Sequence, residues 1–192
     1  MVHHTHTKII EQTKLWVEQM VVGLQLCPFA KPVVGKDLIR YVVCEDPEQG
    51  LITDCLDSEL WLLSKSNPLQ VETTLLILPN VQGDFLDFHY LVEVCRKRIK
   101  ALGFKGVLQL ADFHPLYEFA DSDSNDPANA TNRSPFPTLH LLREDSVERA
   151  RGSGLSAQSI VERNQQVLRE LGWSGIDAIL QPNSDSSGRD FK

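Results

Sequence analysis

Strand and helix patterns alternate along the first two thirds of this chain, and that alternation restricts the fold more than any other feature. Three apolar, β-branched segments have the composition of strands: residues 38–44, 71–78 and 106–111. The segments between them, 47–66 and 85–101, have apolar side chains at helical spacing. Strands joined through helices by short links predict right-handed crossovers in a parallel sheet. The nearly continuous apolar end of segment 71–78 predicts a central strand.

The flanking regions extend this pattern. Helical periodicity over residues 7–26 predicts an additional N-terminal helix that ends before Pro28, and residues 138–142 predict a fourth strand. Two further helices are expected, one near Ser146 and one over 156–171. We therefore predict an α/β fold in a single domain, residues 1–180, with an approximately four-stranded, largely parallel sheet. The composition of residues 181–192 predicts a disordered tail.

Size and charge exclude several classes of protein. The chain has 192 residues, of which 42% are hydrophobic, a size that favours one core over two. Its formal net charge of -7 argues against nucleic acid and anionic lipid surfaces as partners. No apolar run approaches the length of about 20 residues that crosses a bilayer. The N-terminus lacks the apolar stretch of a secretion signal, so we expect a cytoplasmic location.

Metal and cofactor signals are weak. The four cysteines lie far apart without a C-x-x-C pair, which argues against a disulfide framework and a zinc site. Asp112 and His114 have ligand chemistry, but their spacing is too common to indicate a metal. Neither G-x-G-x-x-G nor a P-loop occurs, so a nucleotide held by a glycine loop is not expected. We expect no metal and no cofactor, and the sequence leaves the oligomeric state open.

The long connection 113–137 has no periodic pattern of its own, and such loops are usually either functional or disordered. Its middle, residues 121–130, is polar and predicts a floppy segment. Its two flanks are stiffened by prolines and contain side chains typical of catalysis and anion binding. These candidates are His114, Tyr117, Asn132, Arg133, His140 and Arg143.

If the fourth strand pairs beside the third, the two flanks of the loop meet at one sheet edge. The leading hypothesis is an enzyme for a small anionic metabolite, with His114 or His140 as acid/base and Arg133 as anion clamp. Tyr117 and Asn132 would be orienting donors. Arg143 could bind the same anion only if the strand ends before it. Side chains alternate between the two faces of a strand, so within the strand Arg143 would lie on the face opposite to His140.

Two other interpretations compete with this scheme. In the first, the same polar groups only satisfy the backbone of a long loop, and His140 is a hydrogen-bonded core residue. In the second, the protein is a non-catalytic binding or regulatory module whose acidic loop 121–130 folds on contact with a partner.

Cys27 is a further candidate nucleophile. It follows the first predicted helix, and Lys31 would favour its thiolate, whereas a helix C-terminus would disfavour it. Free cysteine is also among the most buried residue types. We predict a packed thiol rather than a reactive one.

Three separated motifs resemble a known family. They are WVEQMVVGLQLCPFAK at 16–31, HPLYEF at 114–119 and NRSPFPTLHLLRE at 132–144. In this order they resemble the bacterial domain of unknown function 1415 over about residues 10–180. The resemblance implies a bacterial cytoplasmic protein of one domain, and it brings no activity, cofactor or catalytic residue with it.

Overall fold

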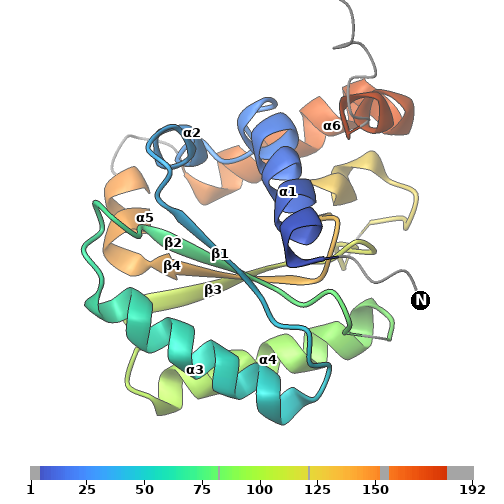
Figure 1. Ribbon diagram of the computed structural model, residues 1–192. Coiled ribbons are helices and arrows are strands. Elements are labelled where there is room, and N and C mark those ends of the chain that lie inside the picture. The colour runs from blue at the N-terminus through green and yellow to red at the C-terminus, as the bar shows by residue number, and fades with distance from the viewer. Residues whose placement is uncertain (1–4, 82, 121, 152–155, 181–192) are drawn as a thin grey trace, which may run out of the picture.

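A computed structural model describes residues 5–81, 83–120, 122–151 and 156–180. These residues form one four-stranded sheet with helices on both faces (Figure 1). The strands are β1 (Ile39–Val43), β2 (Thr73–Ile77), β3 (Leu108–Phe113) and β4 (Thr138–Arg143). Their order in the sheet is β1-β2-β4-β3. The predicted α/β class and the four strands are confirmed.

The sheet is mixed, so the prediction of a largely parallel sheet is wrong. β1 and β2 pair in parallel, whereas β4 is antiparallel to both of its neighbours, β2 and β3. In the described part of the connection between β3 and β4, no helix crosses back over the sheet. The connecting loop stays at the carboxyl end of β3, so β4 starts there and runs in the opposite direction. The predicted central position of β2 and the pairing of the fourth strand with the third are confirmed.

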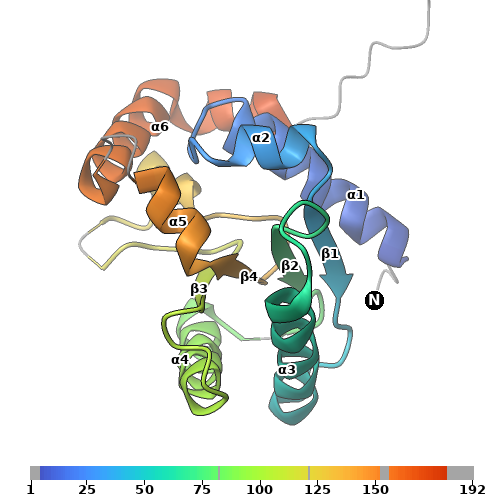
Figure 2. The same cartoon turned by 90° about the vertical axis from the view of Figure 1, so that its left-hand side faces the viewer.

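Two long helices cover one face of the sheet. These are α3 (Gln49–Lys65) and α4 (Phe85–Ala101), which lie side by side in Figure 2. Asp84 caps α4 by accepting hydrogen bonds from the N–H groups of Leu86 and Asp87, so the helix begins where predicted. The apolar stripes of both helices pack on Leu76 and Leu139 of the sheet.

The opposite face is covered by α1 (His6–Trp16), a π-helix (Val17–Val22), α2 (Ala30–Gly35) and α6 (Ala157–Leu180). The predicted helix 7–26 is thus an α-helix that widens into a π-helix after Trp16, and it ends at Val22, before the predicted end. α6 continues past the predicted end at 171 through a kink at Gly172, whose φ of 67° suits glycine. Trp16 and Leu168 meet Leu75 in this second core.

Two short elements complete the fold. α5 (Glu144–Arg151) follows β4 without a linker, and the 3-10 helix η2 (Pro127–Thr131) lies inside the long loop. The expected disordered tail, 181–192, lies outside the described residues. Within the described part of the chain, no helix combines the length and apolar character needed to span a bilayer.

Candidate functional site

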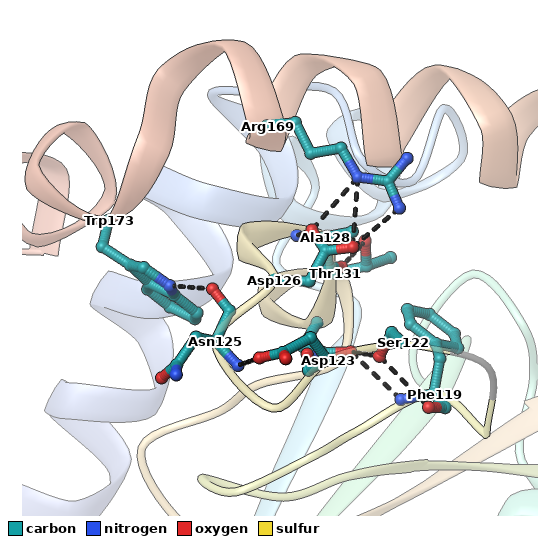
Figure 3. Close-up of polar contacts among 10 residues, drawn as sticks. Phe119, Ser122, Asp123, Asn125, Asp126, Ala128, Thr131, Arg169 and Trp173 are labelled. Carbon is teal, nitrogen blue, oxygen red and sulfur yellow. Dashed lines mark hydrogen bonds and ion pairs between the residues drawn. The ribbon is translucent and has the colours of Figure 1, made fainter.

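The long loop is folded against α6, as Figure 3 shows. Asp126 caps η2 by accepting from the Ala128 N–H, and its carboxylate also pairs with Arg169 of α6, Oδ2 to Nη2 at 2.7 Å. The indole Nε1–H of Trp173 donates to the carbonyl of Asn125 at 2.6 Å. The expected floppy middle is therefore wrong for residues 122–130, because this segment contains η2 and its Ser122, Asp123, Asp126 and Asn129 side chains are hydrogen-bonded within the chain.

Asn129 organises this loop from inside. Its side chain is fully buried, its Oδ1 accepts from the Phe119 N–H and the Ser122 hydroxyl, and its Nδ2 donates to the Asp123 carbonyl. One amide thus satisfies three groups of the polypeptide that encloses it. Asn129 was not among the predicted site residues, and it is a scaffold residue of the loop.

Arg133 is held by the loop. Its Nε donates to the Tyr117 carbonyl at 3.0 Å, its Nη2 donates to the Ser124 carbonyl at 2.9 Å, and its guanidinium lies 4.7 Å from the ring centre of Trp173. These contacts occupy guanidinium N–H groups that Arg133 would need in order to bind an anion. The predicted clamp is therefore already engaged with carbonyls and an aromatic ring.

The two flanks of the loop meet at the carboxyl end of β3, as expected. The His114 N–H donates to the Asn132 carbonyl at 3.1 Å, and Asn132 Nδ2 lies 3.4 Å from the Asp112 carbonyl. Asn132 thus joins the start and the end of the loop. His114, Tyr117, Asn132 and Arg133 are brought together, whereas His140 and Arg143 are not part of this group.

His140 lies on the other face of the sheet. Its Nε2 is 2.7 Å from Thr73 Oγ1, and the Thr73 hydroxyl donates its single proton to the Leu141 carbonyl at 2.5 Å. Nε2 of His140 is therefore the donor in its bond to Thr73, and the ring stays neutral because burial lowers its pKa to about 4. His114 and His140 consequently cannot exchange a proton across the intervening sheet.

Arg143 lies at the far end of β4. Its Nη2 donates to the carbonyls of Leu63 at 2.7 Å and Ser66 at 2.9 Å, at the C-terminus of α3, and to that of Val71 at 3.0 Å. Arginine in this position satisfies carbonyls that a helix end leaves without intrahelical partners. Arg143 and His140 lie on opposite faces of the strand, as the alternation of side chains predicts.

A second group of polar side chains surrounds the carboxyl end of β3 on the α4 face. Arg96 of α4 donates through Nη2 to Asp112 Oδ1 at 2.7 Å and through Nη1 to Glu93 Oε1 at 2.6 Å. The Asp112 side chain is buried, with 12% of its surface exposed, whereas 40% of the Arg96 side chain is exposed. Burial raises the pKa of Asp112, and the positive charges of Arg96 and His89 oppose this effect.

His114 lies towards the N-terminal end of α4, stacked on Phe88 with ring centres 5.0 Å apart, and Phe88 precedes Arg96 by about two turns of the helix. Its Nδ1 accepts a hydrogen bond from the Leu116 N–H at 3.1 Å, so the proton of the neutral ring sits on Nε2. Burial lowers the pKa of His114, and the negative charge of Asp84 opposes this effect. The residue is therefore a neutral hydrogen-bond donor near pH 7.

Tyr117 completes this group, with its ring 4.8 Å from that of Phe85. Burial raises the pKa of Tyr117, the negative charge of Asp112 raises it further, and the positive charge of Arg96 opposes both. The phenol thus remains protonated and interacts electrostatically with the Arg96–Asp112 pair. We call Arg96, Asp112, His114 and Tyr117 the β3-end cluster.

Sequence reasoning missed Arg96 and His89. Arg96 lies near the C-terminus of its helix among basic neighbours, where the helix dipole alone explains a positive charge. Phe85, His89 and Arg96 are four and seven residues apart, a spacing that places them on one flank of α4 beside its core stripe. That spacing is the signal that could have found them.

Cys27 lies between the π-helix and α2. Burial raises the pKa of its thiol, and the N–H groups of Phe29 and Ala30, which are directed at the sulfur, oppose this effect. The direction agrees with a packed thiol, although its reactivity remains a prediction. Among the described residues, no group of three His, Cys, Asp or Glu side chains is placed to hold a metal ion.

Comparison with known proteins places the chain in a family. The family described as "Protein of unknown function (DUF1415)" matches residues 8–178. The chain belongs to the DUF1415 family. No curated protein and no solved structure matches it. Membership of DUF1415 therefore agrees with the resemblance of the three motifs, and the family description assigns no function.

Proposed function

We propose that this DUF1415 protein is an enzyme that transfers a proton on a small molecule bearing a carboxylate or phosphate group. The observation that carries the proposal is the ion pair between Arg96 and buried Asp112 at the carboxyl end of β3, with the phenol of Tyr117 in the electrostatic field of this pair and buried His114 two residues after Asp112. Open α/β sheets commonly bind ligands at the carboxyl ends of their strands. The neighbouring acid, neutral imidazole and phenol differ in protonation, as acid/base chemistry requires.

Each member of the β3-end cluster has one role in this proposal. Arg96 binds the anionic group of the substrate, which displaces Glu93 from Nη1, because an ion pair with an exposed glutamate is weak. Asp112, whose Oδ1 is held by Arg96, accepts the substrate proton on Oδ2. His114 Nε2–H and the Tyr117 hydroxyl donate to the oxygen on which negative charge develops.

This assignment revises the earlier scheme in two respects. Arg96 replaces Arg133 as the anion clamp, because Arg133 is engaged with carbonyl groups. His114 becomes a hydrogen-bond donor rather than a base, because its Nδ1 already accepts from the backbone. The alternative of a binding module finds less support, because Asp126 of the acidic loop pairs with Arg169 within the chain.

A thermal-shift screen with carboxylated and phosphorylated metabolites tests the binding step. Ligand at about a hundred times its dissociation constant stabilises a protein by about 2.7 kcal/mol. We expect the shift to disappear in Arg96→Met and to remain in Arg98→Met. Arg98 is a matched control, because it lies on the same helix, is similarly exposed and is also ion-paired, with Asp57. Equal loss in both variants would contradict the proposal.

Proton transfer is tested on the same ligands by following deuterium incorporation from D₂O with NMR. We expect wild-type protein to catalyse the exchange and Asp112→Asn to lose about 10²- to 10⁴-fold in rate, the usual contribution of a positioned acid or base. Binding should persist in that variant. If no ligand of the screen exchanges a proton, or if Asp112→Asn exchanges at the wild-type rate, the proposed activity is wrong.

A further inference from the structure

A cavity opens at the end of the sheet opposite to the β3-end cluster. In the β3–β4 ladder Phe113 pairs with Thr138 at one end and Leu108 with Arg143 at the other, and the cavity lies at the second end. Its volume is about 160 Å³, and its walls come from the loop before β3, the end of β4 and α5. In Figure 1 α5 lies at one end of the sheet and the long loop at the other. The proposed enzymatic site does not use this region.

Two arginines line this cavity, and they are positioned in different ways. Arg143 is fixed, since three carbonyls accept hydrogen bonds from its Nη2. Arg149 lies one turn into α5, exposed, and its Nη2 donates to the Ser146 hydroxyl at 2.9 Å. The cavity wall thus contains two positive charges and a hydroxyl.

The Nε of Arg143 is a buried donor without a hydrogen-bond partner among the described residues. Leaving such a donor unpaired costs about 1 to 3 kcal/mol, and more for a charged group. Its guanidinium donates to neutral carbonyls, and no carboxylate among the described residues lies within hydrogen-bond distance of it, so the longer-range interaction with Glu72 is its acidic partner there. An anion in the cavity would compensate this positive charge.

The backbone around the cavity is also open to an anion. Gly106 lines it with a φ of 82°, and an added Cβ would meet no atom within 4 Å. Asp145 and Ser146 lie in the first turn of α5, where a helix has no acceptors of its own for its N–H groups. The backbone N–H groups of this turn are therefore additional hydrogen-bond donors beside the two arginines of the cavity.

Asp145 also lines the cavity and restricts the choice of anion. An ionised carboxylate only accepts hydrogen bonds, so it repels an oxyanion unless that oxyanion has a proton to donate. Inorganic phosphate keeps one proton near neutral pH, whereas sulfate keeps none. A phosphate monoester, with a second pKa of about 6, has mostly lost its proton at pH 7.5.

We propose that the cavity between Gly106, Arg143 and α5 is a binding site for inorganic phosphate. Arg149 binds the phosphate oxygens, the fixed guanidinium of Arg143 supplies a second positive charge, Ser146 donates a hydrogen bond, and Asp145 accepts the phosphate proton. The site is independent of the β3-end cluster, and its ligand occupies the opposite end of the sheet.

Titration of the ¹⁵N-labelled chain with phosphate, sulfate and methyl phosphate at pH 7.5 tests the proposal. We expect phosphate to shift the amide signals of Gly106, Asp145 and Ser146 and to bind more tightly than either other anion. Arg149→Ala should weaken phosphate binding about tenfold, as expected for one charge-assisted hydrogen bond. Lys8→Ala removes one exposed charge from α1 and is the matched control, with unchanged affinity expected.

Asp145→Asn separates selective binding from simple charge attraction. The amide can donate as well as accept, so sulfate and phosphate should bind this variant with similar affinity. The proposal is wrong if phosphate does not shift these amides, if Arg149→Ala binds as tightly as wild type, or if Lys8→Ala weakens binding equally. Equal affinity of the wild type for phosphate and sulfate would also contradict it. Arg143 is left unchanged, because its loss would release the end of α3.

Discussion

Glu59 of α3 accepts two hydrogen bonds from Arg40 of β1, one from Nε at 2.7 Å and one from Nη2 at 3.0 Å. The Glu59 side chain is 7% exposed, whereas that of Arg40 is 40% exposed. The pair therefore attaches the edge strand of the sheet to a helix through one desolvated carboxylate and one guanidinium that still reaches water.

Glu59→Gln should destabilise the protein by about 1 to 3 kcal/mol. The value lies below that for a fully buried pair because water can hydrate Arg40 once the charge of its partner is lost. Urea unfolding of the wild type, Glu59→Gln, Arg40→Met and the double variant measures the coupling. A coupling energy near zero would mean that the contact contributes nothing to stability.

His140 predicts a pH-dependent stability. Its folded pKa of about 4 lies below the unfolded value of 6.5, so its contribution is present above pH 6.5 and is lost as the pH falls towards 4. Between about pH 7 and about pH 5 the loss is about 2 kcal/mol. Urea unfolding at both pH values should show this decrease in the wild type, with a smaller decrease in His140→Gln. Identical pH dependence of the two proteins would refute the assignment.

The hydrogen bonds of Arg133 should stabilise the long loop and protect it from proteases. Arg133→Met removes the bonds to the Tyr117 and Ser124 carbonyls and leaves both without that donor, so we expect a stability loss of about 2 kcal/mol. Cleavage by a protease within residues 118–126 should accelerate. Arg133→Lys keeps the positive charge over Trp173 but lacks the planar guanidinium. Its stability and cleavage rate should therefore lie between those of the wild type and Arg133→Met. Wild-type resistance to cleavage in Arg133→Met would contradict this role.

Cys27 predicts slow reaction with thiol reagents near pH 7, because burial raises its pKa. Cys95 should react more slowly still, because it is fully buried and burial raises its pKa to about 12. Mass spectrometry of alkylated peptides over time gives the order. Rapid, selective alkylation of Cys27 below pH 7 would instead make it a candidate nucleophile.

The backbone around Gly23 leaves no room for a side chain at the end of the π-helix. A Cβ at this position would lie 2.2 Å from the backbone oxygen of Gln19, so Gly23→Ala should cost about 1 to 3 kcal/mol. Gly35→Ala is the matched control, because its Cβ would meet no atom within 4 Å. We expect the control to retain or slightly increase the melting temperature, since alanine favours helix over glycine. Similar melting temperatures for both variants would contradict the steric argument.

Local patterns predicted the elements well, since period and caps act within a few residues. The helix 85–101 begins and ends as predicted because Asp84 caps its N-terminus and its apolar stripe is regular. The direction of β4 was not predicted correctly. It depends on which end of the sheet the preceding loop occupies, a long-range property that segment 138–142 does not encode.

The candidate site was predicted in part for a similar reason. His114, Tyr117 and Asn132 do lie together, since both flanks of the loop start at the same sheet edge. Arg133 lies beside them but serves the loop, because whether a guanidinium meets a carbonyl or solvent depends on tertiary packing. Arg96 was missed because a basic residue near a helix C-terminus has an ordinary electrostatic explanation.

The insertion of β4 between β2 and β3 has a consequence for the order in which the chain can fold. As the polypeptide leaves the ribosome, β1, α3 and β2 can associate early, because their contacts are close in sequence. β3 finds no strand beside it until residues 138–143 have been synthesised, and meanwhile both β2 and β3 present unpaired edges. A nascent chain stalled before residue 138 should therefore be the species most prone to aggregate, and pairing of β4 should complete the sheet in one late step.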